Sequence, residues 1–194
     1  MSTGELLANV GFSHGLFLAV LAGGAVYADV PADALGVSLS TQELLVGVGF
    51  GLGLAVANTA AGAAAHALGH TPSEDLRRML APDGAVGWAL LLAVVLPLVA
   101  LFEEFLFRAA LIGGLSGGFG LSPWLLAVGS SAAFAVGHGA QGRAGIAVTG
   151  LLGFVLAGGF VLTGSLLVVV IAHYLVNAAE FVIYEGLGVE LAWR

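Results

Sequence analysis

The chain has 194 residues, of which 59% are hydrophobic and only 9% are charged. Because soluble domains carry roughly 25% charged residues, this composition predicts an integral membrane protein. The chain contains no cysteine and no lysine and has a formal net charge of -7, which excludes disulfides and thiolate chemistry and argues against nucleic acid as a partner.

Six apolar segments follow one another along the chain, with turn-forming residues between them, and no alternating strand pattern is present. The sequence therefore predicts an all-α, polytopic membrane helix bundle of about six transmembrane helices, which form a single integral membrane domain over residues 1–194. Glycines such as Gly47, Gly49, Gly51 and Gly53 are expected to allow close helix packing. The predicted spans are Val10 to Ala28, Leu44 to Leu68, Ala85 to Ile112, Pro123 to His138, Ala144 to Leu162 and Ser165 to Tyr184.

The arginines outside the spans predict the orientation in the membrane. With six spans, Arg77, Arg78, Arg143 and Arg194 all fall on the side that also holds the N-terminus. The opposite loops contain no lysine or arginine. The positive-inside rule then places both termini in the cytoplasm.

Three charged residues interrupt the third apolar segment: Glu103, Glu104 and Arg108. A charge at mid-bilayer costs at least ~2.5–3.5 kcal/mol on insertion scales, so such residues usually face a cavity and carry function. Glu104 and Arg108 are four residues apart, so they can pair along one helix face, while Glu103 projects about 100° away. This spacing predicts that Arg108 neutralises the carboxylate of Glu104, whereas the carboxylate of Glu103 is free.

Polar residues on later spans can reach the same depth. Phe134 and His138 share a face of the fourth span, and His173 and Asn177 share a face of the last. Counting ~1.5 Å of rise per residue places Glu103, both histidines and Asn177 within about two turns of mid-depth. A carboxylate beside an imidazole can deprotonate water, and an imidazole with a carboxamide can stabilise an oxyanion. The cluster therefore predicts hydrolysis.

These residues form three motifs: EExxxR at Glu103 to Arg108, FxxxH at Phe134 to His138, and HxxxN at His173 to Asn177. In this order on successive hydrophobic segments, they resemble the CPBP family of CAAX prenyl proteases and bacteriocin-processing or Abi proteins. The resemblance covers Leu90 to Ala179, inside a motif-bearing core of about residues 85–186. One departure is Ala109, where many members have glycine.

The resemblance implies an intramembrane endopeptidase with a membrane-associated peptide or protein substrate and membrane lipids as partners. Glu103 would activate a water with His138, while His173 and Asn177 would form the oxyanion site. Glu104 and Arg108 would brace the first motif helix, and Phe134 would pack. The family is often labelled metalloprotease, which leaves open a divalent metal such as zinc. Its candidate ligands are Glu103, His138 and His173.

Other interpretations remain open at this stage. Gly114 to Gly117 fits the GxSG form of rhomboid serine proteases, with Ser116 as nucleophile and His173 as base, although this leaves the glutamates without a role. Carboxylates and imidazoles also occur in proton-coupled transporters, and some CPBP relatives are immunity or partner-binding proteins. The remaining polar residues receive packing, interface or loop roles: His14, Asn58, His66, His70 and Glu180.

Overall fold

The structure is a computed structural model that describes residues 2–69 and 75–189. The described residues contain no strand and are overwhelmingly helical, which confirms the all-α prediction. Arg194 and His70 lie outside these residues.

Two long helices open the chain. Helix α1 spans Thr3–Tyr27 and α2 spans Thr41–Ala67. Ser2 caps α1 through a capping box with Glu5, and Ser40 caps α2 by accepting a hydrogen bond from the Glu43 backbone N–H. These caps satisfy backbone donors that the first helical turn leaves unpaired.

The glutamate motif lies on a continuous apolar helix of 35 residues, Ala85–Phe119. A short helix, α3, precedes it. The long helix contains two wider π-helical segments, η1 and η2, and η2 begins directly after Glu104. Such segments are often found at functional sites. The bounds are α3 Asp75–Leu80, α4 Ala85–Leu90, η1 Leu91–Val95, α5 Leu96–Glu104, η2 Phe105–Gly114 and α6 Leu115–Phe119.

The histidine motifs lie on the remaining elements. His138 is the C-cap of α7, and His173 and Asn177 lie on α9. Gly164, with φ 65°, ends α8 in the left-handed conformation that glycine adopts most easily. The bounds are α7 Pro123–Gly137, the 3₁₀ turn η3 Gly139–Gln141, α8 Gly142–Thr163, α9 Leu166–Glu180 and the π-helical η4 Phe181–Gly186.

In the described part of the chain, five helices are long and apolar enough to cross a membrane, and Pro123–Gly137 is a shorter apolar helix. At 1.5 Å per residue this sixth element is only ~22 Å long, so it falls short of a full crossing of ~30 Å. Large apolar side chains such as Phe12, Val20 and Leu125 are exposed on the outside. An apolar exterior of this kind suits contact with lipid, and the protein is an integral membrane protein.

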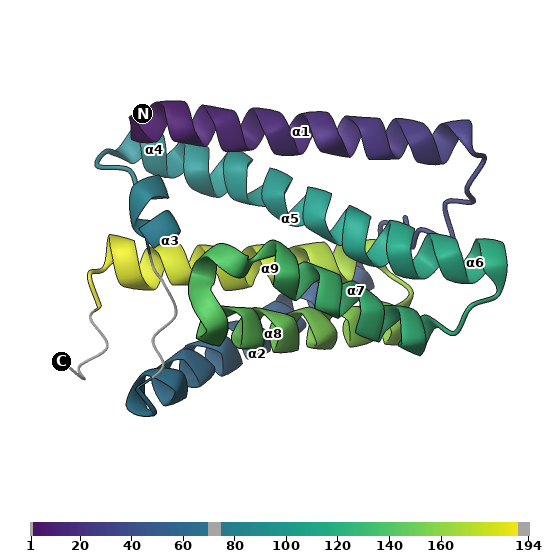
Figure 1. Ribbon diagram of the computed structural model, residues 1–194. Helices are drawn as coiled ribbons and strands as arrows, with labels where there is room; N and C mark the ends of the chain where they lie inside the picture. The colour runs from purple at the N-terminus through teal and green to yellow at the C-terminus, as the bar shows by residue number, and fades with distance from the viewer. Residues whose placement is uncertain (1, 70–74, 190–194) are drawn as a thin grey trace.

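The glutamate helix lies between α1 on one side and the helices α2, α7, α8 and α9 on the other (Figure 1). Helix α5 packs against α1 on one side and α9 on the other, α2 packs along α9, and α7 packs on α8. A Cβ atom at Gly47 or Gly51 would come within about 3.0 Å of α9, so these two glycines permit the close α2–α9 contact. Gly49 and Gly53 face open space, so the packing role predicted for them is wrong.

The start of α1, helix α3 and the end of η4 lie at one end of the bundle, on the left of Figure 1. The turn into α8 lies toward the same end. Arg77 and Arg78 belong to α3, and Arg143 lies in the first turn of α8. The arginines in the described residues outside the spans therefore share one end, as the six-segment topology predicted. Which side of the membrane this end faces stays a prediction, as does the single-domain organisation.

Candidate active site

The predicted pairing of Glu104 with Arg108 is present in the core. Arg108 Nη1 donates a hydrogen bond of 2.8 Å to Glu104 Oε1, and both side chains are fully buried. Arg108 Nη2 donates a second bond of 2.8 Å to the carbonyl oxygen of Gly153 on α8. The guanidinium also lies 4.8 Å from the ring centroid of Phe134. The arginine thus ties the glutamate helix to both α7 and α8.

Glu104 also contacts His173, which the sequence did not predict. His173 Nδ1 lies 2.7 Å from Glu104 Oε1, and the imidazole is almost completely buried. Because Glu104 is a carboxylate paired with Arg108, Nδ1 carries the hydrogen and donates it. This bond fixes the ring so that Nε2 points to the other glutamate.

Glu103 faces two imidazoles, as the depth count predicted. Its Oε1 lies 3.9 Å from His138 Nε2, and its Oε2 lies 3.6 Å from His173 Nε2. Both separations exceed a direct hydrogen bond and are too short for a water on the line between the two atoms. A water that contacts Glu103 and an imidazole would therefore lie to the side of them, in the cavity that these groups line.

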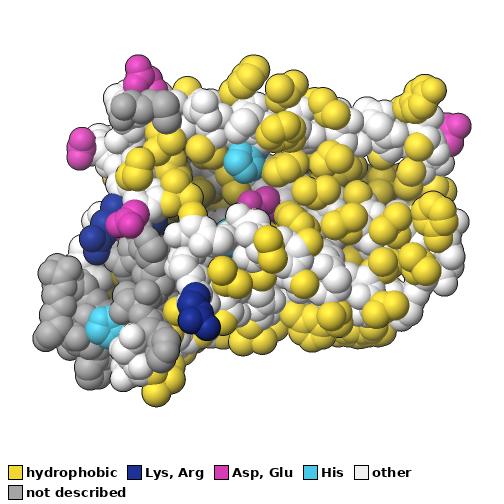
Figure 2. Space-filling model, in the orientation of Figure 1, with side chains coloured by type: hydrophobic (Ala, Val, Ile, Leu, Met, Phe, Trp, Pro, Cys, Tyr) yellow, Lys and Arg dark blue, Asp and Glu magenta, His cyan; other side chains and the backbone are white. Residues whose placement is uncertain are grey.

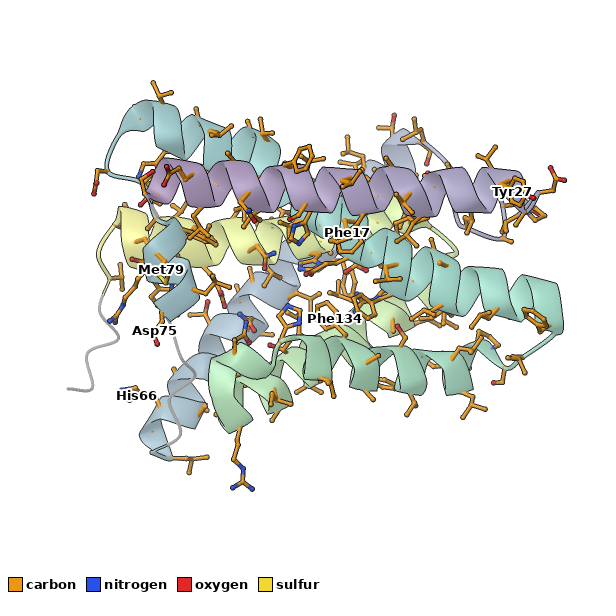
Figure 3. All side chains as sticks on the ribbon, turned by 45° about the horizontal axis from the view of Figure 1, so that its top comes forward. Phe17, Tyr27, His66, Asp75, Met79 and Phe134 are labelled. Carbon is orange, nitrogen blue, oxygen red and sulfur yellow. The ribbon has the colours of Figure 1, made fainter. Side chains whose placement is uncertain are left out.

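His138 is oriented by its own helix. Its Nδ1 lies 2.9 Å from the carbonyl oxygen of Phe134, one turn earlier. A carbonyl oxygen can only accept, so Nδ1 carries the hydrogen and Nε2 presents a lone pair toward Glu103 when the ring is neutral. Phe134 lies in the middle of the bundle (Figure 3), with its ring centroid 4.4 Å from that of His138 and 6.0 Å from that of His173. It holds the two imidazoles apart, in keeping with the predicted packing role.

A cavity of about 350 Å³ joins these groups. Glu103, His138, His173 and Asn177 all line it. Asn177 lies one turn after His173, and its carboxamide hydrogen-bonds no residue in the described part of the chain. Figure 2 shows acidic and histidine side chains at a hollow in the middle of an otherwise largely hydrophobic face. The structure thus brings the four predicted residues to one cavity.

The cavity extends beyond the predicted residues. His14, Asn58, His66 and Glu180 also line it, so the packing, interface or loop roles predicted for these four were incomplete. Asn58 on α2 donates a hydrogen bond of 2.6 Å to Glu180 Oε1 at the end of α9. Glu180 follows His173 by seven residues, which is two helical turns on the same face. The seven-residue spacing from His173 was the sequence signal that could have placed Glu180 at the site. No neighbouring motif pointed to Asn58.

The predicted metal ligands lie together at the cavity. Among the described residues, no group of three His, Cys, Asp or Glu side chains is arranged to hold a metal ion. Nδ1 of each imidazole is bonded to Phe134 or Glu104, so each ring turns its Nε2 toward Glu103. Histidines that bind a metal through Nε2 usually carry such an Nδ1 bond as well, so metal dependence stays a prediction.

Ser116, the nucleophile of the rhomboid interpretation, lies elsewhere. It lines a separate hollow with Asp33, Ile112 and Pro123. No contact joins it to His173 in the part of the chain that the structure describes. The geometry thus gives Ser116 no catalytic partner.

A polar, carboxylate-bearing cavity inside a bundle of apolar helices occurs in membrane enzymes and in transporters. Comparison with known proteins favours an enzyme: residues 85–179 match the family model of the type II CAAX prenyl endopeptidase Rce1-like proteins. This match supports assignment of the chain to the CPBP family of CAAX-type intramembrane proteases. No match was found among curated proteins or solved structures. The matched segment carries all three motifs and agrees closely with the predicted core.

Proposed function

We propose that the protein is an intramembrane endopeptidase in which Glu103 and His138 activate a water and His173 and Asn177 stabilise the oxyanion. The observation that carries this proposal is the position of the Glu103 carboxylate between two imidazole Nε2 atoms at the wall of a cavity. A carboxylate and an imidazole that both accept hydrogen bonds from one water leave its oxygen lone pair directed into the cavity.

The reaction then proceeds in two steps. The water oxygen attacks the carbonyl carbon of the peptide bond, and its proton passes to Glu103. The carbonyl oxygen becomes an oxyanion, which accepts hydrogen bonds from the Asn177 carboxamide and from His173 Nε2. When the C–N bond breaks, Glu103 returns the proton to the leaving nitrogen, so that water is consumed and a carboxylic acid and an amine form. Transfer of the acid proton to the amine then gives a carboxylate and an ammonium ion.

His173 can serve as an oxyanion donor only in one protonation state. Because Nδ1 donates to Glu104, Nε2 donates only when the ring carries both protons. In that state the charges of Glu103, Glu104, Arg108 and His173 sum to zero. A neutral sum is the arrangement in which buried charges compensate one another best.

Glu103→Gln tests the proposal because it keeps the size of the side chain and removes the base. The probes are two internally quenched peptides of one sequence, ending in a CAAX box, with and without a farnesyl group on the cysteine. The protein is purified in detergent. The variant should lose ~10²–10⁴-fold in kcat/KM, the usual contribution of a general base. Ser116→Ala should retain full activity.

Two outcomes would overturn the proposal. An active Glu103→Gln variant with an inactive Ser116→Ala variant would support the serine-protease interpretation. Wild-type protein that cleaves neither peptide but moves protons across liposomes would support transport. Cleavage of the farnesylated peptide alone would identify a prenylated substrate, which nothing in the sequence identified.

A further inference from the structure

Gln141 is a polar residue of the cavity wall that the reaction above does not use. It ends the 3₁₀ turn η3, three residues after His138, and its backbone N–H donates a hydrogen bond of 3.0 Å to the His138 carbonyl. Its side chain lines the same cavity as Glu103 and His138. Gln141 is thus held at a fixed position in the wall of the cavity that also contains Glu103 and His138.

Helix α8 fixes the side chain of Gln141 as well. Thr149 Oγ1 donates a hydrogen bond of 2.7 Å to Gln141 Oε1, and Thr149 is buried. Gly145 lies between them, where any added Cβ atom would overlap the Cβ atom of Gln141. The stem of the glutamine therefore packs on the glycine, while its oxygen is bound by the threonine. Because its stem and its oxygen are both held, the Gln141 side chain loses little further conformational entropy when it binds a ligand.

The Nε2 amide of Gln141 is the part that remains available. It donates to no residue in the described ranges, and it is not enclosed, since the enclosed unpaired side-chain atoms there are Glu104 Oε2 and Arg108 Nε. Because Gln141 lines the cavity, this accessible amide is a hydrogen-bond donor available to a ligand there. Its ligand must be an acceptor.

A peptide bond in a membrane can reach a protease only after its helix has unwound, which leaves backbone carbonyls without partners at a depth where water is scarce. Resting on the function proposed above, we propose that Gln141 Nε2 donates a hydrogen bond to a backbone carbonyl of the substrate. Because His173 and Asn177 are assigned to the scissile carbonyl, the carbonyl that Gln141 binds is another one along the peptide.

This role predicts a change in KM and not in kcat, because a contact away from the reacting atoms binds the ground state and the transition state equally. With the cleaved quenched peptide as probe, Gln141→Ala should raise KM about three- to tenfold, the effect of one neutral hydrogen bond. Gln141→Glu keeps an acceptor for Thr149 but turns a carboxylate oxygen toward the carbonyl. It should raise KM further without changing the melting temperature.

A thioamide scan of the peptide gives the sharper test, since sulfur accepts hydrogen bonds less well than oxygen. In wild type, the thioamide at the carbonyl bound by Gln141 should raise KM, and in Gln141→Ala the same thioamide should have no further effect. Such non-additivity identifies a direct contact. Additive effects at every position, or a Gln141→Ala variant that loses kcat and keeps KM, would overturn the assignment.

The Glu103→Gln variant separates this inference from the proposed function. If Glu103→Gln is inactive and Gln141→Ala behaves as wild type, only the role of Gln141 is wrong. If Glu103→Gln retains turnover, the proposed reaction is wrong and the role of Gln141 fails with it.

Discussion

Glu104 Oε1 is bonded to Arg108 and to His173 at once, 2.8 Å from the first and 2.7 Å from the second. The sequence predicted only the bond to Arg108. The second bond couples the proposed brace to the proposed oxyanion site, because the carboxylate that anchors the arginine also sets the orientation of the imidazole. Glu104 is thus a positioning residue in the proposed reaction as well as part of the core.

The two glutamates should therefore differ in their effect on stability. Arg108→Ala and Glu104→Ala should lower the free energy of unfolding by ~3–5 kcal/mol, because each leaves a buried charge without its partner. Glu103→Gln should leave the melting temperature unchanged or raise it, since Glu103 makes no direct hydrogen bond and His173 can release its second proton when the charge of Glu103 is lost. Thermal melting of the three variants in detergent tests this. An equal loss for Glu103→Gln and Arg108→Ala would mean that the roles of the glutamates are exchanged.

Asn177→Ala should mainly lower kcat. Its carboxamide is proposed to bind the oxyanion, which exists only after attack on the carbonyl, so the ground state loses little. Removal of one such donor typically costs ~10²–10³ in kcat. Steady-state kinetics with the quenched peptide measures this, and Asn177→Asp is the matched control, because it keeps the size and loses the donor. A rise in KM with unchanged kcat in both variants would assign Asn177 to substrate binding instead.

Gly153 should be required for the position of Arg108. A Cβ atom there would lie 2.9 Å from Phe134 Cδ1 and 3.6 Å from Arg108 Nη2. Gly153→Ala should therefore destabilise the protein by ~1–3 kcal/mol, as overpacking of a core does. Gly158 on the same helix provides the control, since its added Cβ atom would make ordinary contacts with Trp124 at 3.7 Å. Equal melting temperatures for the two alanine variants would contradict the packing.

The predicted orientation can be tested directly because the natural chain contains no cysteine. Asp83 precedes α4 at the arginine-bearing end, and Ser122 precedes α7 at the opposite end; both are exposed. In intact cells, a membrane-impermeant maleimide should label Ser122→Cys and leave Asp83→Cys unlabelled until the membrane is opened. The reverse pattern would place both termini outside.

The sequence predicted those features that depend on one helix or on depth. The spacing of Glu104 and Arg108 fixed their pairing, and counting residues from the loops brought Glu103 to the level of His138 and His173. The bond between Glu104 and His173 depends on how α5 and α9 are rotated toward each other, which residue spacing does not specify. Asn58 and Glu180 are separated by 122 residues, so only the packing of α2 along α9 brings them together.

The π-helical winding of η2, directly after the glutamate pair, sets how many residues the glutamate helix needs between Phe105 and Gly114. Arg108 lies inside η2, and its contacts with Gly153 and Phe134 depend on the angle at which the helix delivers it. A π-helical segment accommodates a residue more per turn than regular α-helix does. Removal of a single residue between Phe105 and Gly114 would allow the segment to rewind as α-helix. Residues after Gly114 would keep their faces, because the number of turns would stay the same. Arg108, inside the segment, would be delivered at another angle, so Glu104 would keep His173 and lose the arginine that ties it to α7 and α8.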